Sequence, residues 1–238
     1  MSVSEPTGEH ETTWERALVD LDDRGFALIP SALTKLSCDE IAGYYADEQR
    51  FRSRVEMARY AFGRGEYKYF NYPLPEIVQQ KRNSIYPRLA ALANQWSEQL
   101  GSKTARFPEQ LSDFLEQCHR AGQKRPTPLL LKYSAGDFNC LHQDLYGDIV
   151  FPFQVTFFLS QHARDFTGGE FVLAEQRPRQ QSRIEVLSPA QGDAVVFAVR
   201  HRPVRGARGY YRANLRHGVS TVHSGHRYTL GIIFHDAK

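Results

Sequence analysis

Cysteine is scarce in this 238-residue chain, and its three cysteines lie far apart, at Cys38, Cys118 and Cys140. Because no CxxC pair is present, a zinc ribbon and a disulfide scaffold are not expected. No apolar run reaches the roughly 20 residues that a membrane span needs. The segment Met1–Thr13 also lacks the basic start and apolar stretch of a secretory signal. We therefore expect a cytoplasmic protein without a membrane segment.

A strong excess of one charge sign is also missing. The chain has 30 Lys and Arg residues against 27 Asp and Glu residues, a net charge of +3, which is too small by itself to indicate nucleic-acid binding. Hydrophobic residues make up 41% of the chain, so a sizeable core can form and global disorder is excluded. The aromatic content of 12% favours a β-rich core.

The first half of the chain shows mainly helical patterns. A polar tail over residues 1–12 is expected to be flexible, and Gly25–Pro30 has the composition of a strand. Amphipathic spacing and capping residues predict helices over four segments, namely Trp14–Asp22, Ser37–Phe51, Ile77–Leu100 (restarted at Pro87) and Pro108–Arg120. We interpret Arg50–Pro75, in which arginines alternate with aromatic residues, as a long loop or lid.

After Thr127 the pattern changes to short β-type runs separated by turn residues. The predicted strands are Pro128–Tyr133, Asn139–Gln143, Phe153–Leu159, Glu170–Ala174, Ile184–Leu187, Ala194–Val199, Ala213–Val222 and Tyr228–His235. This spacing predicts a sandwich or a barrel-like jelly roll, and the absence of helix-length segments between the strands argues against a doubly wound sheet. We expect an α+β, mainly β, single domain over 13–238, with helical support at about 13–125 and a jelly-roll core at about 126–238.

The triplet His142-Gln143-Asp144 is the first candidate for metal binding. In a strand, residues i and i+2 point to the same face, so His142 and Asp144 could give one nitrogen and one oxygen to a single ion. A third ligand from another strand would complete a facial triad with open positions, as in non-haem Fe(II) sites. A single triplet is a weak signal, and a surface turn capped by Asp144 is the alternative.

A second group of residues lies nearer the C-terminus. His217 lies in a predicted strand, and Arg227 follows ten residues later. If the two strands pair as a hairpin, the guanidinium would lie beneath the metal site, where it could hold a carboxylate through two hydrogen bonds. Thr229 would face the same way as Arg227. The alternatives are a core histidine and a surface arginine, and His223 and His226 compete for the role of third ligand.

In combination, these motifs resemble a known superfamily. The order of the motifs is His142-x-Asp144, Gly168-Gly169-Glu170-Phe171, Gly192–Phe197, His217 and Arg227-x-Thr229. This order is similar to that of the 2-oxoglutarate/Fe(II)-dependent oxygenases and, within them, of the prolyl-hydroxylase-like branch. The segment Arg216–Asp236 resembles an uncharacterised bacterial group in the same superfamily. The resemblance covers roughly residues 25–30 and 127–236.

The resemblance implies both a fold and a set of site residues. It implies a double-stranded β-helix in which His142, Asp144 and His217 bind iron. It also implies that Arg227, assisted by Thr229 and Tyr133, binds the distal carboxylate of 2-oxoglutarate. Many prolyl hydroxylases carry lysine where this chain has Arg227, although arginine also occurs in the superfamily.

The implied activity is that of a dioxygenase that uses Fe(II), 2-oxoglutarate and O2. It would hydroxylate a C–H bond of a small molecule or a protein side chain and release succinate and CO2. Arg64, Tyr67 and Tyr69 in the arginine- and tyrosine-rich segment 50–72 are candidate substrate contacts. The loop Arg200–Arg212 adds further arginines. They could form a cationic rim for an acidic or nucleic-acid substrate, but we prefer to interpret them as a solvated surface.

Two other functions remain open. One is oxidative demethylation of nucleic acid, similar to that of the alkylated-base repair oxygenases, although the two-arginine ending of that group is not matched here. The other is a non-catalytic jelly roll that only binds a metal or ligand, against which the complete triad and Arg227 argue.

Overall fold

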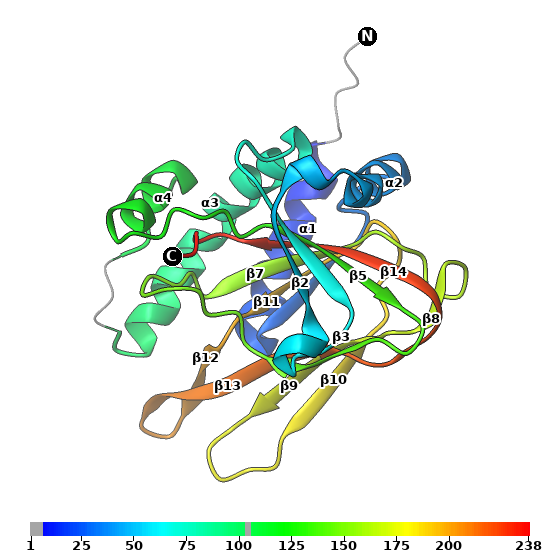
Figure 1. The fold of residues 1–238 in the computed structure, drawn as a ribbon. Coiled ribbons are helices and arrows are strands. Elements are labelled where there is room, and N and C mark those ends of the chain that lie inside the picture. The colour runs from blue at the N-terminus through cyan, green and yellow to red at the C-terminus, as the bar shows by residue number, and fades with distance from the viewer. Residues whose placement is uncertain (1–6, 103–105) are drawn as a thin grey trace.

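Two antiparallel sheets form the framework of the protein, a double-stranded β-helix (Figure 1). The computed structural model describes residues 7–102 and 106–238. The larger sheet comprises β1 (Phe26–Ile29), β2 (Phe51–Glu56), β4 (Glu66–Phe70), β5 (Leu129–Ser134), β7 (Phe153–Phe158), β8 (Phe166–Gly168), β11 (Ala194–Ala198) and β14 (Val222–Ile233). The smaller sheet comprises β3 (Gly63–Arg64), β6 (Phe138–His142), β9 (Phe171–Gln176), β10 (Arg183–Leu187), β12 (His201–Gly206) and β13 (Gly209–Val219).

The strand order places sequence-distant segments side by side. In the larger sheet the order is β1-β11-β7-β14-β5-β4-β2, and β8 also pairs with β14. In the smaller sheet the order is β10-β9-β13-β6-β3, and β12 also pairs with β13. All of the eight strands predicted after Thr127 are present, and β1 matches the strand predicted at Gly25–Pro30. The largest differences are at the last two, since β13 begins at Gly209 instead of Ala213 and β14 begins at Val222 instead of Tyr228.

Four α-helices accompany the larger sheet: α1 (Thr7–Arg24), α2 (Lys35–Gly43), α3 (Glu76–Gln99) and α4 (Leu111–Arg120). α1 begins at Thr7, so only residues 1–6 of the predicted tail 1–12 precede it, and these lie outside the described residues. The cap of α2 is Thr34, whose side chain accepts a hydrogen bond from the Ser37 amide, and this helix ends at Gly43, before the predicted end. α3 continues through Pro87 without the predicted restart.

Aromatic side chains fill the core between the helices and the larger sheet. The Trp96 ring of α3 packs edge-on against Phe153 of β7, with 4.6 Å between centroids. Phe151 lies among the rings of Tyr86, Phe107, Phe114 and Phe234. A smaller apolar cluster joins the two sheets and includes Phe158, Phe171 and Phe197. The abundance of aromatic residues in the sequence is therefore explained by packing.

Two segments predicted as loops are strands instead. The segment 50–75 contains β2 and β4, which extend the larger sheet beyond β5, and β3, which pairs with β6 of the smaller sheet. The segment Arg200–Arg212 forms most of the β12–β13 hairpin. The predicted division into helical support and jelly-roll core is therefore incomplete, because four strands lie before residue 125.

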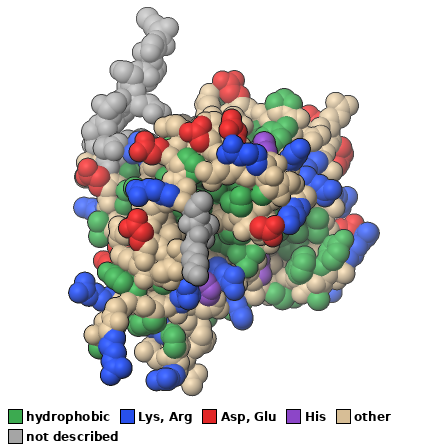
Figure 2. Space-filling model, turned by 90° about the vertical axis from the view of Figure 1, so that its left-hand side faces the viewer, with side chains coloured by type: hydrophobic (Ala, Val, Ile, Leu, Met, Phe, Trp, Pro, Cys, Tyr) green, Lys and Arg blue, Asp and Glu red, His purple; other side chains and the backbone are tan. Residues whose placement is uncertain are grey.

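The surface carries both signs of charge (Figure 2). Acidic and basic side chains alternate over the upper part of the face in that view, and Lys and Arg side chains occupy its lower end. Within the described residues, no helix is both long and apolar enough to cross a membrane.

Candidate metal centre

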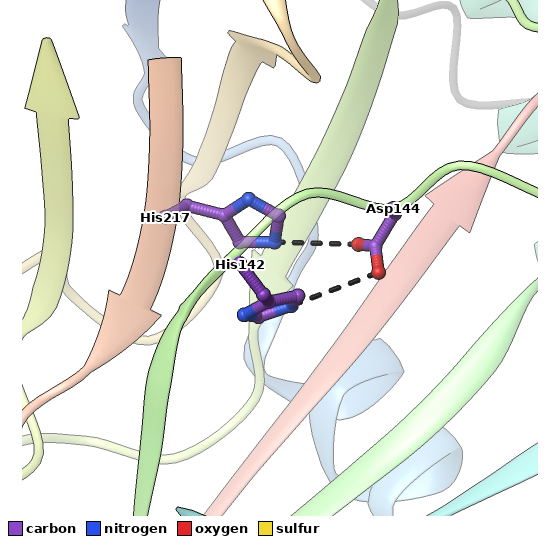
Figure 3. Close-up of side chains that lie close together, drawn as sticks. All are labelled: His142, Asp144 and His217. Carbon is purple, nitrogen blue, oxygen red and sulfur yellow. Dashed lines mark ion pairs between the residues drawn. The ribbon is translucent and has the colours of Figure 1, made fainter. Parts of the chain in front are cut away.

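Two histidines meet where β6 and β13 pair. His142 is the last residue of β6, and its register partner on β13 is His217. Their ring centroids are 4.2 Å apart. Asp144 lies two residues beyond the end of β6, so the strand alternation used to relate it to His142 does not apply. Figure 3 shows that the three side chains nevertheless point toward one another.

The three side chains provide two nitrogen donors and one oxygen donor. Nε2 of His142 is 3.6 Å from Oδ1 of Asp144, and Nε2 of His217 is 3.3 Å from Oδ2 of the same carboxylate (Figure 3). The donor atoms of the three residues all lie within 4.8 Å of one another. A single divalent ion can bridge such a set and keep other coordination positions open.

The imidazole of each histidine is oriented by its surroundings. Nδ1 of His142 lies 2.8 Å from the carbonyl oxygen of Cys140, so Nδ1 is the protonated nitrogen and Nε2 is free to bind a metal. His217 is 6% exposed and lies beside the rings of Phe197 and Phe171, with centroid distances of 4.7 and 6.1 Å. Packing therefore holds the second imidazole in place.

Two neutral side chains hold the carboxylate. The Tyr146 hydroxyl donates to Oδ1 of Asp144 at 2.8 Å, and Nε2 of Gln154 donates to Oδ2 at 3.0 Å. Gln143, between the two candidate ligands, donates instead to Asn214 and to the Leu215 carbonyl of β13. Neither Tyr146 nor Gln154 was predicted from the sequence. Tyr146 lies two residues from Asp144, but Gln154 is brought to the site by β7 and has no local signal.

The electrostatics favour the protonation states that bind a metal. Burial alone would raise the pKa of Asp144, but its interactions with His217 and His142 and the hydrogen bond from the Tyr146 hydroxyl hold it below the ordinary value. Burial, and then the neighbouring His142, lower the pKa of His217. An ionised carboxylate and a neutral imidazole are therefore present at neutral pH, as metal binding requires.

Arg227 lies in the larger sheet, on β14, where its register partner is Tyr133 of β5. It is 2% exposed. Within the described residues, its Nε and Nη2 atoms have no hydrogen-bond partner. Its guanidinium lies 5.4 Å from the ring centroids of both Tyr133 and Phe158. Burial lowers its pKa to about 10, so the group stays charged at neutral pH.

The predicted hairpin between the His217 and Arg227 strands is wrong. β13 belongs to the smaller sheet, whereas β14 lies between β7 and β5 in the larger one. The chain changes sheets after Val219, so the two residues approach a common cavity from opposite sheets.

A single cavity contains both groups. Its volume is about 200 Å³, and its lining includes His142, Asp144, His217, Tyr133, Arg227 and Thr229. Apolar residues complete the walls, among them Leu129, Leu131, Phe171 and Val219. The structure therefore brings the predicted metal ligands and the predicted carboxylate-binding residues into one cavity.

The remaining candidates lie at different distances from this cavity. Tyr67 lines it, and the buried Tyr69 packs edge-on against Tyr67 with 5.4 Å between centroids. Arg64 is exposed on β3 and is not among the lining residues. His223 and His226 are exposed on β14, outside the cluster of donor atoms.

A family model matches residues 65–237 of this chain, and its description is "Oxygenase, catalysing oxidative methylation of damaged DNA". Two proteins of Mycobacterium tuberculosis, "Uncharacterized protein MT2286" (strain CDC 1551 / Oshkosh) and "Uncharacterized protein Rv2227" (strain ATCC 25618 / H37Rv), are each 49% identical over 168 residues. The match covers 71% of this chain and 72% of each relative.

Solved structures share the fold at low sequence identity. A prolyl hydroxylase from Trichoplax adhaerens, in complex with a hypoxia inducible factor oxygen degradation domain peptide fragment, has a TM-score of 0.64 at 13% identity, covering 99% of this chain and 94% of its own. An oxidoreductase of the 2OG-Fe(II) oxygenase family from Burkholderia pseudomallei has a TM-score of 0.50 at 16% identity, with coverages of 94% and 92%.

Proposed function

Since the chain belongs to the Oxygenase-NA family, we propose that it uses Fe(II) and 2-oxoglutarate to hydroxylate a C–H bond of its substrate. The observation that carries this proposal is the cavity in which two imidazoles and a carboxylate converge beside a buried arginine, whose Nε and Nη2 atoms have no partner in residues 7–102 and 106–238. Fe(II) and 2-oxoglutarate fit these two groups of residues, respectively.

His142, Asp144 and His217 would hold the iron. Two neutral nitrogens and one carboxylate oxygen match the facial donor set of non-haem Fe(II) oxygenases. Bound Fe(II), together with 2-oxoglutarate and O2, would supply the oxidative decarboxylation that releases succinate and CO2 and drives substrate hydroxylation. The hydrogen bonds from Tyr146 and Gln154 keep both carboxylate oxygens of Asp144 in place.

Arg227 would hold the distal carboxylate of 2-oxoglutarate. Its Nε and Nη2 atoms, which have no hydrogen-bond partner among the residues that the structure describes, can donate two charge-assisted hydrogen bonds. The Tyr133 hydroxyl oxygen already accepts from Nδ2 of Asn139 at 3.3 Å, so its own hydrogen remains free to donate. Thr229 adds a hydroxyl on the same strand face as Arg227. The apolar walls would exclude water and strengthen these interactions.

For the substrate, a small molecule or a protein side chain remains the first candidate. The prolyl hydroxylase of T. adhaerens, which shares the fold, was determined with a peptide. Nucleic acid is the second candidate, and the description of the matching family favours it. Hydroxylation of an N-methyl group gives a hemiaminal that releases formaldehyde, so both candidates require the same C–H chemistry from the site.

Removal of the proposed ligands tests the proposal. Anaerobic addition of Fe(II) and 2-oxoglutarate to the protein should give a weak visible charge-transfer band, and O2 should then give succinate. We expect His142→Ala and Asp144→Ala to lose both signals, whereas the control His223→Ala, at an exposed histidine, keeps them. Succinate formation that persists in both ligand variants would contradict the assignment.

The two substrate classes differ in their products. With an N-methylated oligonucleotide, the reaction should release formaldehyde in amounts equal to succinate. With a peptide or small molecule, the product should gain one oxygen atom. Formaldehyde without any oxygenated peptide or small-molecule product would reject the first candidate, and the opposite result would reject the second.

A further inference from the structure

The β12–β13 hairpin has an unusual local charge. Residues 200–216 contain six arginines and no Asp or Glu, although the whole chain is almost balanced at 30 basic and 27 acidic residues. The arginines are Arg200, Arg202, Arg205, Arg208, Arg212 and Arg216. The hairpin therefore carries a local excess of positive charge.

The alternation of side chains along the strands places these arginines on two different faces of the hairpin. Arg202, opposite Ala213, is buried and pairs with Glu175, so its role is structural. Arg205 lies opposite Tyr210 in the register, so the two share a face of the hairpin. Arg216 lies on the same face as Tyr210, because an even number of positions separates them along β13. Arg205, Arg216 and Arg208, near the tip, are exposed. The face of the hairpin that carries Arg205, Tyr210 and Arg216, called its outer face below, is therefore positively charged.

The exposed charges are not neutralised by neighbours. Within the described residues, no ion pair with a carboxylate is formed by Arg200, Arg205, Arg208 or Arg216. In the β9–β10 hairpin, by contrast, Arg177 pairs with Glu175 and Arg183 pairs with Glu185. Tyr210, 41% exposed, adds an aromatic ring to this face. In Figure 1 the hairpin extends from the bottom of the molecule, and Figure 2 shows basic side chains at that lower end.

We propose that the outer face of the β12–β13 hairpin binds the sugar-phosphate backbone of duplex DNA. This inference rests on the nucleic-acid candidate of the proposed function and adds where the duplex is held. Arginines bind phosphates by charge and by paired hydrogen bonds. A two-stranded ribbon also has dimensions that the major groove admits.

The hairpin is linked directly to the metal centre. β13 carries Gly209 at its tip and His217 in the cavity. At about 3.3 Å per residue, these positions are roughly 26 Å apart along the strand. That length is shorter than one turn of B-DNA, about 34 Å. The tip of the hairpin therefore lies less than the length of one helical turn from His217, although Arg216 and His217, as adjacent strand residues, lie on opposite faces of β13.

Salt-dependent binding of a duplex tests the surface. The probe is an unmodified fluorescent duplex of about 20 base pairs, titrated with the full chain between about 50 and 250 mM salt. The test variant is Arg205→Gln/Arg208→Gln/Arg216→Gln. We expect at least tenfold weaker binding at about 100 mM salt. The log–log salt slope should fall by about 0.9 for each phosphate that the variant no longer neutralises, or about 2–3 in all.

A matched control removes three charges elsewhere. Arg16→Gln/Arg120→Gln/Arg164→Gln changes the net charge equally at exposed positions outside the hairpin, and it should keep the wild-type affinity and slope. An equal weakening in control and test variants would overturn the proposal. So would failure of the wild-type chain to bind the duplex at about 50 mM salt. Tenfold preference for single-stranded DNA, or equal competition by polyglutamate, would also overturn it.

A second readout separates this proposal from the proposed function. The hairpin variant should keep Co(II) binding at the metal centre and succinate formation without DNA. If the wild-type chain forms no succinate but binds the duplex through the hairpin, the proposed function fails and the DNA surface stands. Loss of Co(II) binding together with a lower melting temperature in the variant would indicate misfolding, and the Arg208→Gln variant alone would then provide the test.

Discussion

At the scale of single residues, the proposed metal centre depends on side chains that do not themselves bind the metal. Each oxygen of the Asp144 carboxylate accepts one hydrogen bond, from Tyr146 or from Gln154. These bonds fix the rotation of the carboxylate, and they favour its ionised form. The affinity for metal should therefore depend on residues outside the donor set.

Removal of the Tyr146 hydroxyl tests this dependence. We expect Tyr146→Phe to weaken metal binding by about tenfold, because partners of metal ligands typically contribute about 10–100-fold to affinity. Gln154→Leu should have an effect of similar size. Titration with Co(II), followed by visible absorbance, measures the affinity directly. Tyr44→Phe removes a hydroxyl that donates to Glu40 and does not line the cavity, so it serves as the control. Unchanged affinity in both site variants would contradict this role.

Substitution of Arg227 should change the affinity for 2-oxoglutarate and not the affinity for the metal. We expect Arg227→Lys to raise the KM for 2-oxoglutarate about tenfold, since the charge stays but the paired hydrogen bonds are removed. Arg227→Met should raise it about a hundredfold or more, which corresponds to removal of a charged hydrogen-bonding partner. Co(II) affinity should stay within about twofold of wild type. An equal decrease in cosubstrate and metal affinity would indicate misfolding instead.

The Arg227→Met substitution should also affect the stability of the fold. The guanidinium is buried with two nitrogen atoms that have no partner in the described part of the chain. Replacing an uncompensated buried charge with an apolar side chain is often neutral or stabilising. We therefore expect Arg227→Met to maintain or raise the free energy of unfolding of the cofactor-free protein in urea. A decrease of more than about 2 kcal/mol would show that the arginine also supports the fold.

At the scale of elements, a buried ion pair connects α3 to the end of the chain beyond β14. Nη2 of Arg82 donates to Oδ1 of Asp236 at 2.8 Å and to the Phe234 carbonyl at 2.9 Å. Tyr72 accepts from Arg82 and donates to Asp236, and His119 of α4 lies 2.9 Å from the same carboxylate. The cluster fixes two helices against the larger sheet.

Breaking this pair should destabilise the whole domain. Arg82 and Asp236 are both fully buried, so Arg82→Met leaves a carboxylate without its charged partner. We expect a decrease of about 3–5 kcal/mol in the free energy of unfolding, measured by urea denaturation. The double variant Arg82→Met/Asp236→Leu should be destabilised by less than the sum of the single variants. Gln80→Leu, exposed on the same helix, should change stability by at most about 0.5 kcal/mol.

At the scale of the whole molecule, one buried histidine makes stability depend on pH. His235 follows β14, and its Nδ1 accepts a hydrogen bond from the Phe151 amide at 3.2 Å. Burial, together with the nearby Arg82, lowers its pKa to about 4 from 6.5. The unfolded chain therefore binds a proton at higher pH than the folded chain does. Stability should be full above about pH 6.5 and should fall as the pH is lowered toward about 4.

The size of this effect follows from the shift of the pKa. A difference of about 2.5 pH units corresponds to roughly 3 kcal/mol. Urea denaturation of the metal-free protein between about pH 7.5 and 4.5 measures it. His235→Asn keeps an acceptor near the Phe151 amide without a titrating ring, so the acid dependence should be shallower in this variant. An identical pH dependence in both proteins would show that other groups control acid unfolding.

The sequence by itself determined the residue types of the site and most of the strands. Alternating apolar residues and turn residues after Thr127 are local signals, so these strands of the jelly roll were predicted, whereas the starts of β13 and β14 were placed several residues too late. The prediction of a loop over residues 50–75 failed because β2 is half-buried on both faces. Apolar and polar residues therefore do not alternate along this strand. The edge strand β2 pairs with β4, and β4 in turn pairs with β5, which lies far away in the sequence.

Only the tertiary structure decided how the site is assembled. The order His142, Asp144, His217 and Arg227 is visible in the sequence, but their convergence depends on β13 and β14 lying in opposite sheets. The contact of Gln154 on β7 with Asp144 also depends on the tertiary fold, because no local pattern marks it. Local patterns record which face of a strand is apolar. Which strands become neighbours is set by burial of the whole core, a property that no single segment contains.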